Sequence, residues 1–225
     1  MLYKQGAMGS TSDNNNSKRT MEIKSELIKY TDMRVEHFAD VVDLFEQCFP
    51  ISYSISWMWT ITNNKKFSKM VATYEGKVVG VLWAIVDNLE ELNKQHYDTI
   101  MIEFLPPEMF CCYILNIAVS SEFRRHKIAT HLLKLLYKSF TSSKKRVDAV
   151  FLHVMVDNEP AIKFYEKMHF QKFILIPHYY KIGESEKNVD AWIYMSTLQQ
   201  INIFKKLFNT TVSFFYKLVN FCKTS

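Results

Sequence analysis

The chain has 225 residues, of which 48% are hydrophobic and 23% charged, and its formal net charge is +5. This length and composition allow one sizeable core, so we expect a single folded domain, and so small a net charge gives no reason to expect nucleic acid as a partner. The four cysteines, Cys48, Cys111, Cys112 and Cys222, lack the paired spacing of a zinc site, and no apolar secretory leader opens the chain, so we predict no bound metal and a reducing environment.

The N-terminal part begins with a polar stretch and then becomes regular. Residues 1–20 are rich in Ser and Asn and lack hydrophobic periodicity, which predicts a disordered segment ahead of a domain at 21–196. Residues 22–30 have the pattern of a strand. Residues 34–49 predict a helix, and the members of its apolar stripe are Val35, Phe38, Val42 and Phe45.

A loop, a hairpin and an insertion are expected next. Pro50 interrupts the periodicity of "FPISYSISW", which predicts a loop that leads into a short helix. Residues 69–87 contain two β-rich apolar runs around "YEGK", which predicts a hairpin with Gly76 in its turn. Residues 88–110 have a mixed composition and predict an irregular insertion.

The remaining part of the domain alternates between strands and helices. Asn158 is the candidate N-cap of one helix, and Pro160 stands in its first turn, where a missing N–H costs nothing. The expected strands are 110–120, 148–156, 171–182 and 190–196, and the expected helices are 128–140 and 158 to about 168. This order predicts an α/β core with neighbouring, largely parallel strands.

The turn before the helix at 128–140 is strongly basic. It reads Arg124-Arg125-His126-Lys127-Ile128-Ala129. A helix N-terminus offers unpaired N–H groups and the positive end of the helix dipole, so such a turn predicts a ligand that carries phosphate. The chain contains neither G-x-x-x-x-G-K-S/T nor G-x-G-x-x-G, so we do not expect a nucleotide hydrolase or a dinucleotide-binding enzyme.

This strand, turn and helix resemble the pyrophosphate-binding signature R/Q-x-x-G-x-G/A of the GNAT superfamily of N-acetyltransferases. The resemblance implies a GNAT fold, which is an α/β fold with a mixed, splayed central sheet flanked by helices, and acetyl-CoA as the co-substrate. Lys127 stands where the family has glycine, and its side chain could crowd the phosphates or add a contact to them. The cofactor contacts implied by the resemblance are Ile117, Ala118, Val119, Arg125, His126, Lys127, Ile128, Ala129, Thr130, Asn158 and Tyr165.

A closer resemblance, to the membrane-associated N-terminal acetyltransferase F family, covers about residues 22–196. It depends on the ordered segments "FPISYSISW", "TNNKKF", "ATYEGKVVG", "YILNIAV", "EFRRHKIATHLL", "FLHVMVDNEPAIKFYE" and "IPHYYKI". It implies that Tyr113 and His153 act as general bases while the substrate amine attacks acetyl-CoA directly. An α-amine, with a reference pKa of ~7.7–8.0, must lose a proton before it attacks, whereas either residue taken alone would more often be core packing.

The same resemblance implies how a protein N-terminus would bind. Ser52 stands where the family has a glutamate, and His178 where it has a third tyrosine. The residues implied to enclose the substrate are Phe49, Pro50, Tyr53, Leu115, Tyr179 and Tyr180. The expected substrates retain the initiator Met before a hydrophobic or amphipathic residue and include transmembrane proteins. Two alternatives remain open, a lysine (histone) acetyltransferase and a catalytically weak GNAT-like membrane adaptor. We expect a monomer or a weak homodimer.

The segment at 197–225 is basic, aromatic and free of acidic residues. Its uncharged run at 207–216 is far shorter than the ~20 residues that a membrane span requires. The residues that recur at helical spacing are Ile201, Phe204, Phe208, Phe215, Leu218 and Cys222. This pattern predicts an amphipathic helix that binds a membrane peripherally, or one that docks on the domain or on a second copy. The resemblance favours the membrane and implies the cytosolic face of the Golgi.

Overall fold

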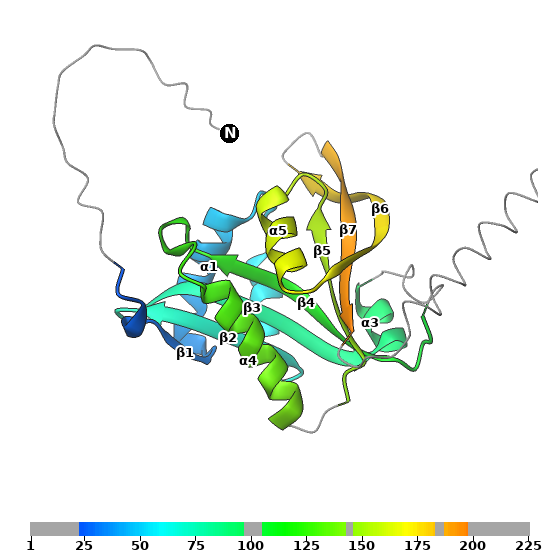
Figure 1. The fold of residues 1–225 in the computed structure, drawn as a ribbon. Coiled ribbons are helices and arrows are strands. Elements are labelled where there is room, and N and C mark those ends of the chain that lie inside the picture. The colour runs from blue at the N-terminus through cyan, green and yellow to red at the C-terminus, as the bar shows by residue number, and fades with distance from the viewer. Residues whose placement is uncertain (1–22, 97–104, 143–145, 183–186, 198–225) are drawn as a thin grey trace, which may run out of the picture.

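A seven-stranded sheet with helices on both faces forms the centre of the structure, a computed structural model (Figure 1). The structure describes residues 23–96, 105–142, 146–182 and 187–197. The strand order is β1-β2-β3-β4-β5-β7-β6. The strands are β1 (Lys29–Asp32), β2 (Phe67–Tyr74), β3 (Lys77–Asn88), β4 (Phe110–Val119), β5 (Ala149–Met155), β6 (Gln171–Ile182) and β7 (Lys187–Thr197).

The helices cover the two faces of this sheet. One face carries α1 (Phe38–Cys48), α2 (Ile55–Asn63) and α3 (Leu89–His96), and the other carries α4 (Ile128–Ser142) and α5 (Glu159–Lys167) (Figure 1). Short 3-10 helices in the described connections are η1 (Ser25–Leu27), η2 (Val35–His37) and η4 (Ser121–Phe123). Because both faces are covered, β3 is buried over most of its length rather than on alternate residues.

The local sequence signals with specific turn or cap chemistry are confirmed. The hairpin predicted at 69–87 is formed by β2 and β3, and Gly76 has a φ of 84° in its turn. The helix predicted after Asn158 is α5, and the Asn158 side-chain oxygen accepts a hydrogen bond from the Ala161 N–H at 3.2 Å. The helix predicted at 128–140 is α4, which extends to Ser142.

Other predictions of the elements were wrong in part. Residues Ser25–Leu27 form a 3-10 helix, and the first strand is limited to Lys29–Asp32. Val35 lies in η2 and is 51% exposed, because α1 begins only at Phe38. The buried face of α1 consequently differs from the predicted stripe and consists of Val41, Leu44 and Phe45.

The insertion and the strand directions also need correction. The irregular insertion predicted at 88–110 begins with α3, whose Leu89 and Leu92 are buried. The Asn88 side-chain oxygen caps this helix by accepting from the Glu91 N–H at 2.8 Å. The sheet is not largely parallel: among the described strands only β4 and β5 pair in parallel, and the other pairs are antiparallel.

The pairing of β4 with β5 ends early, and this places the candidate site. Residues Cys111, Cys112 and Tyr113 of β4 pair with β5, and the ladder stops at Tyr113 and Phe151. Beyond this point β4 pairs with β3 and β5 pairs with β7. The two parallel strands therefore separate over their C-terminal halves, which confirms the splayed sheet.

Helix α4 approaches the sheet closely at its N-terminus. A Cβ atom added to Gly80 of β3 would lie 2.7 Å from Cγ2 of Ile128, the first residue of α4. Glycine therefore allows the first turn of α4 to lie directly on the sheet beside the end of β4.

Two predictions fall on other parts of the chain. The segment predicted to be disordered, 1–20, lies outside the described residues, as does the predicted amphipathic tail beyond Thr197. Both stay predictions. In the described part of the chain, no helix combines the length and apolar character needed to span a bilayer.

Candidate active site

A cavity of about 100 Å³ lies where β4 and β5 separate. Its walls come from the loop after α1, the C-terminal halves of β4 and β5, α5 with its cap Asn158, and Tyr180 of β6. The predicted site residues Phe49, Pro50, Tyr53, Leu115, Ile117, His153, Asn158, Tyr165 and Tyr180 all line it. The structure therefore brings residues from five distant segments around one cavity.

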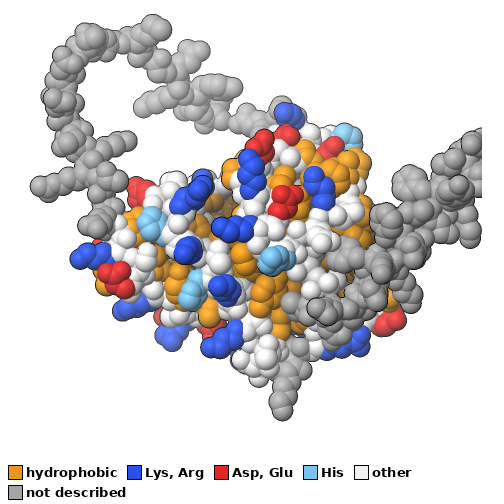
Figure 2. Space-filling model, in the orientation of Figure 1, with side chains coloured by type: hydrophobic (Ala, Val, Ile, Leu, Met, Phe, Trp, Pro, Cys, Tyr) orange, Lys and Arg blue, Asp and Glu red, His pale blue; other side chains and the backbone are white. Residues whose placement is uncertain are grey.

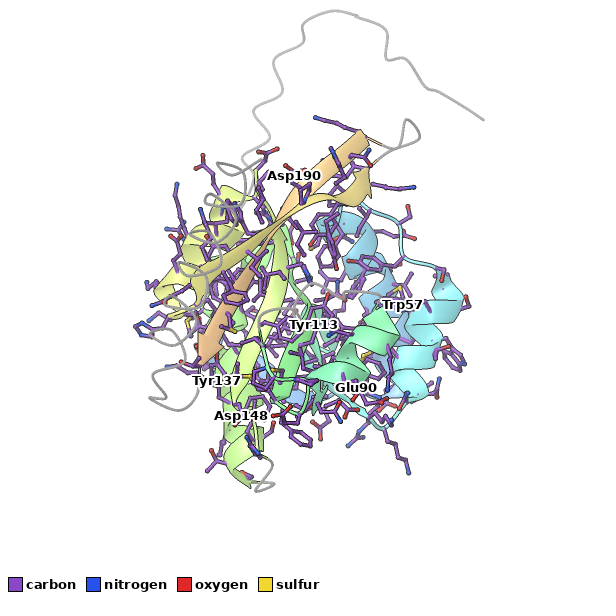
Figure 3. The ribbon with its side chains drawn as sticks, turned by 90° about the vertical axis from the view of Figure 1, so that its right-hand side faces the viewer. Trp57, Glu90, Tyr113, Tyr137, Asp148 and Asp190 are labelled. Carbon is purple, nitrogen blue, oxygen red and sulfur yellow. The ribbon has the colours of Figure 1, made fainter. Side chains whose placement is uncertain are left out.

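Tyr113 and His153 are hydrogen-bonded to each other. The Tyr113 hydroxyl lies 3.1 Å from Nδ1 of His153. Tyr113 belongs to the last β4–β5 pair, whereas His153 lies two residues beyond that pair on β5, where it lines the cavity. Figure 3 shows Tyr113 well inside the molecule. This pair can accept a proton from a group in the cavity and pass it along the hydrogen bond.

The ring of Tyr179 packs face to face against the imidazole of His153. The two rings are stacked, with centroids 4.3 Å apart and an interplanar angle of 9°. Tyr180, which lines the cavity, packs edge-on against Tyr179 at 4.8 Å. The predicted tyrosine pair of β6 is thus divided between supporting the histidine and lining the cavity.

An irregularity in β6 positions these two tyrosines. Ile176 pairs with Ala191 and Tyr180 with Val189, so three residues of β6 lie opposite one residue of β7. Within this bulge His178 has a φ of 56°, and its backbone N–H donates to an Asp190 carboxylate oxygen at 2.8 Å. Figure 3 shows Asp190 in the first half of β7, which runs beside β6. The carboxylate therefore fixes the bulge that aims Tyr179 and Tyr180.

The loop after α1 forms the opposite wall. Phe45, Phe49, Tyr53 and Trp57 make successive ring contacts with centroids 5.0–5.5 Å apart. The Tyr53 hydroxyl accepts a hydrogen bond from the Asn116 side-chain nitrogen at 2.8 Å. Burial raises the pKa of Tyr53, and the hydrogen bond from Asn116 partly opposes this. Tyr53 is therefore a neutral hydroxyl that is tied to β4.

The basic turn lies between η4 and α4. Its backbone is left-handed at two residues, Arg125 with a φ of 71° and Lys127 with a φ of 62°. Both side chains are exposed, and Lys, Arg and His side chains occupy the middle of the face that carries α4 (Figure 2). The Arg124 guanidinium turns back to donate to the Val119 carbonyl at 3.3 Å. The first N–H groups of α4 have no intrahelical acceptor, so they and the basic side chains can bind an anion.

Asn158 and Tyr165 combine structural roles with a place in the cavity wall. Asn158 caps α5 with its side-chain oxygen, which leaves its amide nitrogen for another acceptor. Tyr165 is 8% exposed, and burial raises its pKa. The capping role of Asn158 and the burial of Tyr165 are therefore both compatible with contact to a ligand.

Asn116 is a cavity residue that the sequence analysis did not single out. It is an asparagine inside the otherwise apolar run "CYILNIAV", is 5% exposed, and lines the cavity. A polar amide in a buried strand was a signal that could have identified it, because a buried polar group needs a partner.

The acetyltransferase (GNAT) family profile matches residues 38–170. N-alpha-acetyltransferase 60 of Danio rerio is 37% identical over 135 residues, which is 60% of this chain and 55% of that protein. The Drosophila melanogaster protein of the same name is 30% identical over 182 residues, 72% of this chain and 65% of that protein. The matched part of the chain thus spans about 55–65% of the length of these curated relatives.

Solved structures share the fold. Arabidopsis thaliana NAA60 in complex with a bisubstrate analogue superposes with a TM-score of 0.66 at 19% identity, covering 76% of this chain and 99% of that one. The structure of the same protein in complex with acetyl-CoA gives 0.63 at 20% identity, covering 76% and 98%. The chain therefore has the GNAT fold and belongs to the acetyltransferase (GNAT) family.

Proposed function

We propose that this chain transfers the acetyl group of acetyl-CoA to the N-terminal α-amines of proteins. The observation that carries the proposal is the hydrogen-bonded Tyr113–His153 pair, 3.1 Å apart, at the cavity where β4 and β5 separate. The names of the relatives support it, since they are N-alpha-acetyltransferases.

Acetyl-CoA would supply a thioester carbon that the amine can attack, and the residues of this chain fit its parts. The turn at 125–130 presents the N–H groups of the α4 N-terminus together with exposed cationic side chains to the diphosphate. The segment Ile117–Val119 is no longer paired with β5, so its backbone can hydrogen-bond the pantetheine arm. Asn158 and Tyr165 complete the wall on the side of α5.

The Tyr113–His153 pair would take the proton of the attacking amine, directly or through one water. The N–C bond then forms and the C–S bond breaks, and the leaving thiolate takes a proton from the same pair. A backbone N–H exposed where the strands separate would stabilise the negative oxygen that develops in between. No acyl-enzyme is required, because the amine attacks the thioester itself.

We also propose the finer substrate class. Phe49, Tyr53 and Tyr180 give the cavity an aromatic wall, which suits a first residue with a long apolar side chain such as Met. Protein N-termini that retain Met before a hydrophobic or amphipathic residue would therefore be preferred. Ser52 is exposed and does not line the catalytic cavity, so the loss of the family's glutamate at this position leaves its wall intact.

The test compares peptides that begin Met-Leu and Met-Lys with the same sequences blocked at the α-amine, all of them containing an internal lysine. Mass spectrometry after incubation with acetyl-CoA is expected to find one acetyl group on the α-amine of the free peptides and none on the blocked ones. Acetylation of lysine in both sets would instead identify a lysine acetyltransferase. If acetyl-CoA does not bind at sub-millimolar concentration, the chain is a non-catalytic GNAT-like protein.

Lys127→Gly tests what the lysine does at the turn position where the family has glycine. Glycine adopts a φ of 62° without the ~1–2 kcal/mol that a side chain costs there, so we expect the melting temperature to rise by about 2–4 °C. We expect acetyl-CoA to bind about two- to five-fold more weakly, because one exposed ion pair to the diphosphate is lost.

Calorimetric titration at low and high salt measures this change in affinity, which should shrink as salt screens the charge. Arg125→Gly is the matched comparison within the turn, since it also removes a cation from a left-handed position, with a φ of 71°. Tighter binding of acetyl-CoA to Lys127→Gly would show that the lysine crowds the phosphates.

A further inference from the structure

A bulge in β4 brings Asn116 to the same face of the sheet as the substrate loop. Trp83 of β3 pairs with Asn116 and Ala84 with Ile114, so Leu115 is an extra residue in β4. Strict alternation would place Asn116 with Ile114 on the α4 and α5 face. Leu115 packs with the residues of the opposite face, as alternation requires, but the Asn116 amide reaches Tyr53 on that same face.

The Asn116 amide is only half satisfied. Its nitrogen donates to the Tyr53 hydroxyl at 2.8 Å, whereas its oxygen is buried and has no hydrogen-bond partner among the residues that the structure describes. Buried amide oxygens in folded proteins almost always accept a hydrogen bond. Asn116 lines the cavity, so this unpartnered acceptor belongs to the cavity wall.

The position of Asn116 along β4 indicates which substrate group can donate a hydrogen bond to its side-chain oxygen. It lies between Tyr113, which belongs to the proposed base pair, and Ile117–Val119, the backbone proposed to hold the pantetheine arm. The substrate amine must present its lone pair to the thioester and its proton to the base. The next donor along the substrate is the N–H of its first peptide bond, and Asn116 is bonded to the loop proposed to enclose the first substrate residues.

We propose that Asn116 is a substrate-binding residue whose side-chain oxygen accepts a hydrogen bond from the first peptide N–H of the protein N-terminus to be acetylated. The proposal depends on the proposed function and assigns a contact within that site. The proposal also gives each end of the Asn116 amide a role. The nitrogen holds Tyr53 in the cavity wall, and the oxygen binds the backbone N–H of the substrate. Every protein N-terminus except one with proline second offers this N–H, so the contact selects for peptide backbone rather than for sequence.

The test uses a pair of Met-Leu peptides that differ in one atom, with the first peptide bond either an amide or an ester. The ester removes the N–H and keeps the shape. Wild-type protein is expected to prefer the amide by about 10-fold in kcat/KM, because a site built to accept a hydrogen bond rejects an analogue that lacks the donor. Asn116→Leu, of similar volume, is expected to use the two peptides within about twofold of each other.

Two variants distinguish the proposed contact of Asn116 with the substrate from its hydrogen bond to Tyr53 of the loop. Tyr53→Phe removes the bonded hydroxyl but keeps the Asn116 oxygen, so its kcat/KM falls while the preference for the amide persists. Asn116→Asp keeps an acceptor oxygen and can accept in turn from the Tyr53 hydroxyl, so it also keeps the preference. Acetyl-CoA affinity and the melting temperature establish that each variant is folded. Asn116→Ala, which has no side-chain acceptor, replaces Asn116→Leu if the leucine variant does not fold.

The outcomes distinguish this proposal from the proposed function. An Asn116→Leu protein that still prefers the amide by about 10-fold overturns the contact, as does a wild-type protein that uses both peptides equally. In either case the proposed function stands, because α-amines are acetylated. If wild-type protein acetylates neither peptide and no other α-amine, the proposed function itself fails.

Discussion

His153→Ala is expected to lower the kcat for peptide acetylation by about 100-fold or more and to leave the Kd for acetyl-CoA unchanged. A positioned general base contributes typically 10²–10⁴-fold, and His153 is the imidazole that lines the cavity beside Tyr113. The proposed diphosphate contacts lie on a different element, the turn before α4, so cofactor binding should not depend on this ring. Steady-state kinetics and calorimetric titration measure the two quantities.

Tyr113→Phe should have an effect of the same kind, because it removes the hydroxyl that is 3.1 Å from His153. The double variant should be hardly worse than either single variant, since residues that act as a unit are not additive. His169→Asn is the matched control, because His169 is exposed after α5, has a φ of 66° that asparagine tolerates, and does not line the cavity. Unchanged turnover in His153→Ala would remove this residue from the mechanism.

Gly80→Val is expected to weaken acetyl-CoA binding by about 10-fold and to lower the free energy of unfolding by about 1–3 kcal/mol. Even a Cβ at this position would lie 2.7 Å from Cγ2 of Ile128, and a β-branched isoleucine cannot turn aside easily. The first turn of α4 must therefore move off β3, and with it the N–H groups proposed to hold the diphosphate. Chemical denaturation and calorimetric titration detect the two losses.

The compensating change is Ile128→Ala, which removes the atom that the new side chain meets. The double variant Gly80→Val/Ile128→Ala should be less destabilised than the sum of the two single variants, because neighbouring changes in one contact couple. Acetyl-CoA affinity should return toward that of Ile128→Ala alone. Strict additivity would show that Gly80 and the position of α4 are independent.

Local chemistry explains which parts of the fold the sequence predicted. The turn at Gly76 and the cap at Asn158 are determined by residues within a few positions of each other, and both were found. The cap of α3 had the same kind of signal, with Asn88 three residues before Glu91, but the mixed composition of the segment concealed it. Long-range order, such as the place of β7 between β5 and β6, leaves no such local trace.

In the candidate site, too, features that depend on residues distant in the sequence could not be predicted from local patterns. Tyr113 and His153 are 40 positions apart, and only the resemblance to a family paired them before the structure did. The face that Asn116 occupies depends on a bulge that shifts the register of β4, and a pattern of alternating residues cannot reveal it. In the same way, the left-handed backbone at Lys127 and His178 stands where glycine or asparagine would have been expected.

In the proposed reaction, the turn before α4 holds the coenzyme diphosphate while Tyr113 and His153 face the reacting amine. A crystal structure with coenzyme A joined covalently to a Met-Leu peptide tests it most directly. We expect the diphosphate at the N–H groups of residues 125–130 and the peptide nitrogen within one water of the Tyr113–His153 pair. A conjugate bound with its diphosphate away from this turn, or with its nitrogen on the far side of β4 from the pair, would contradict it.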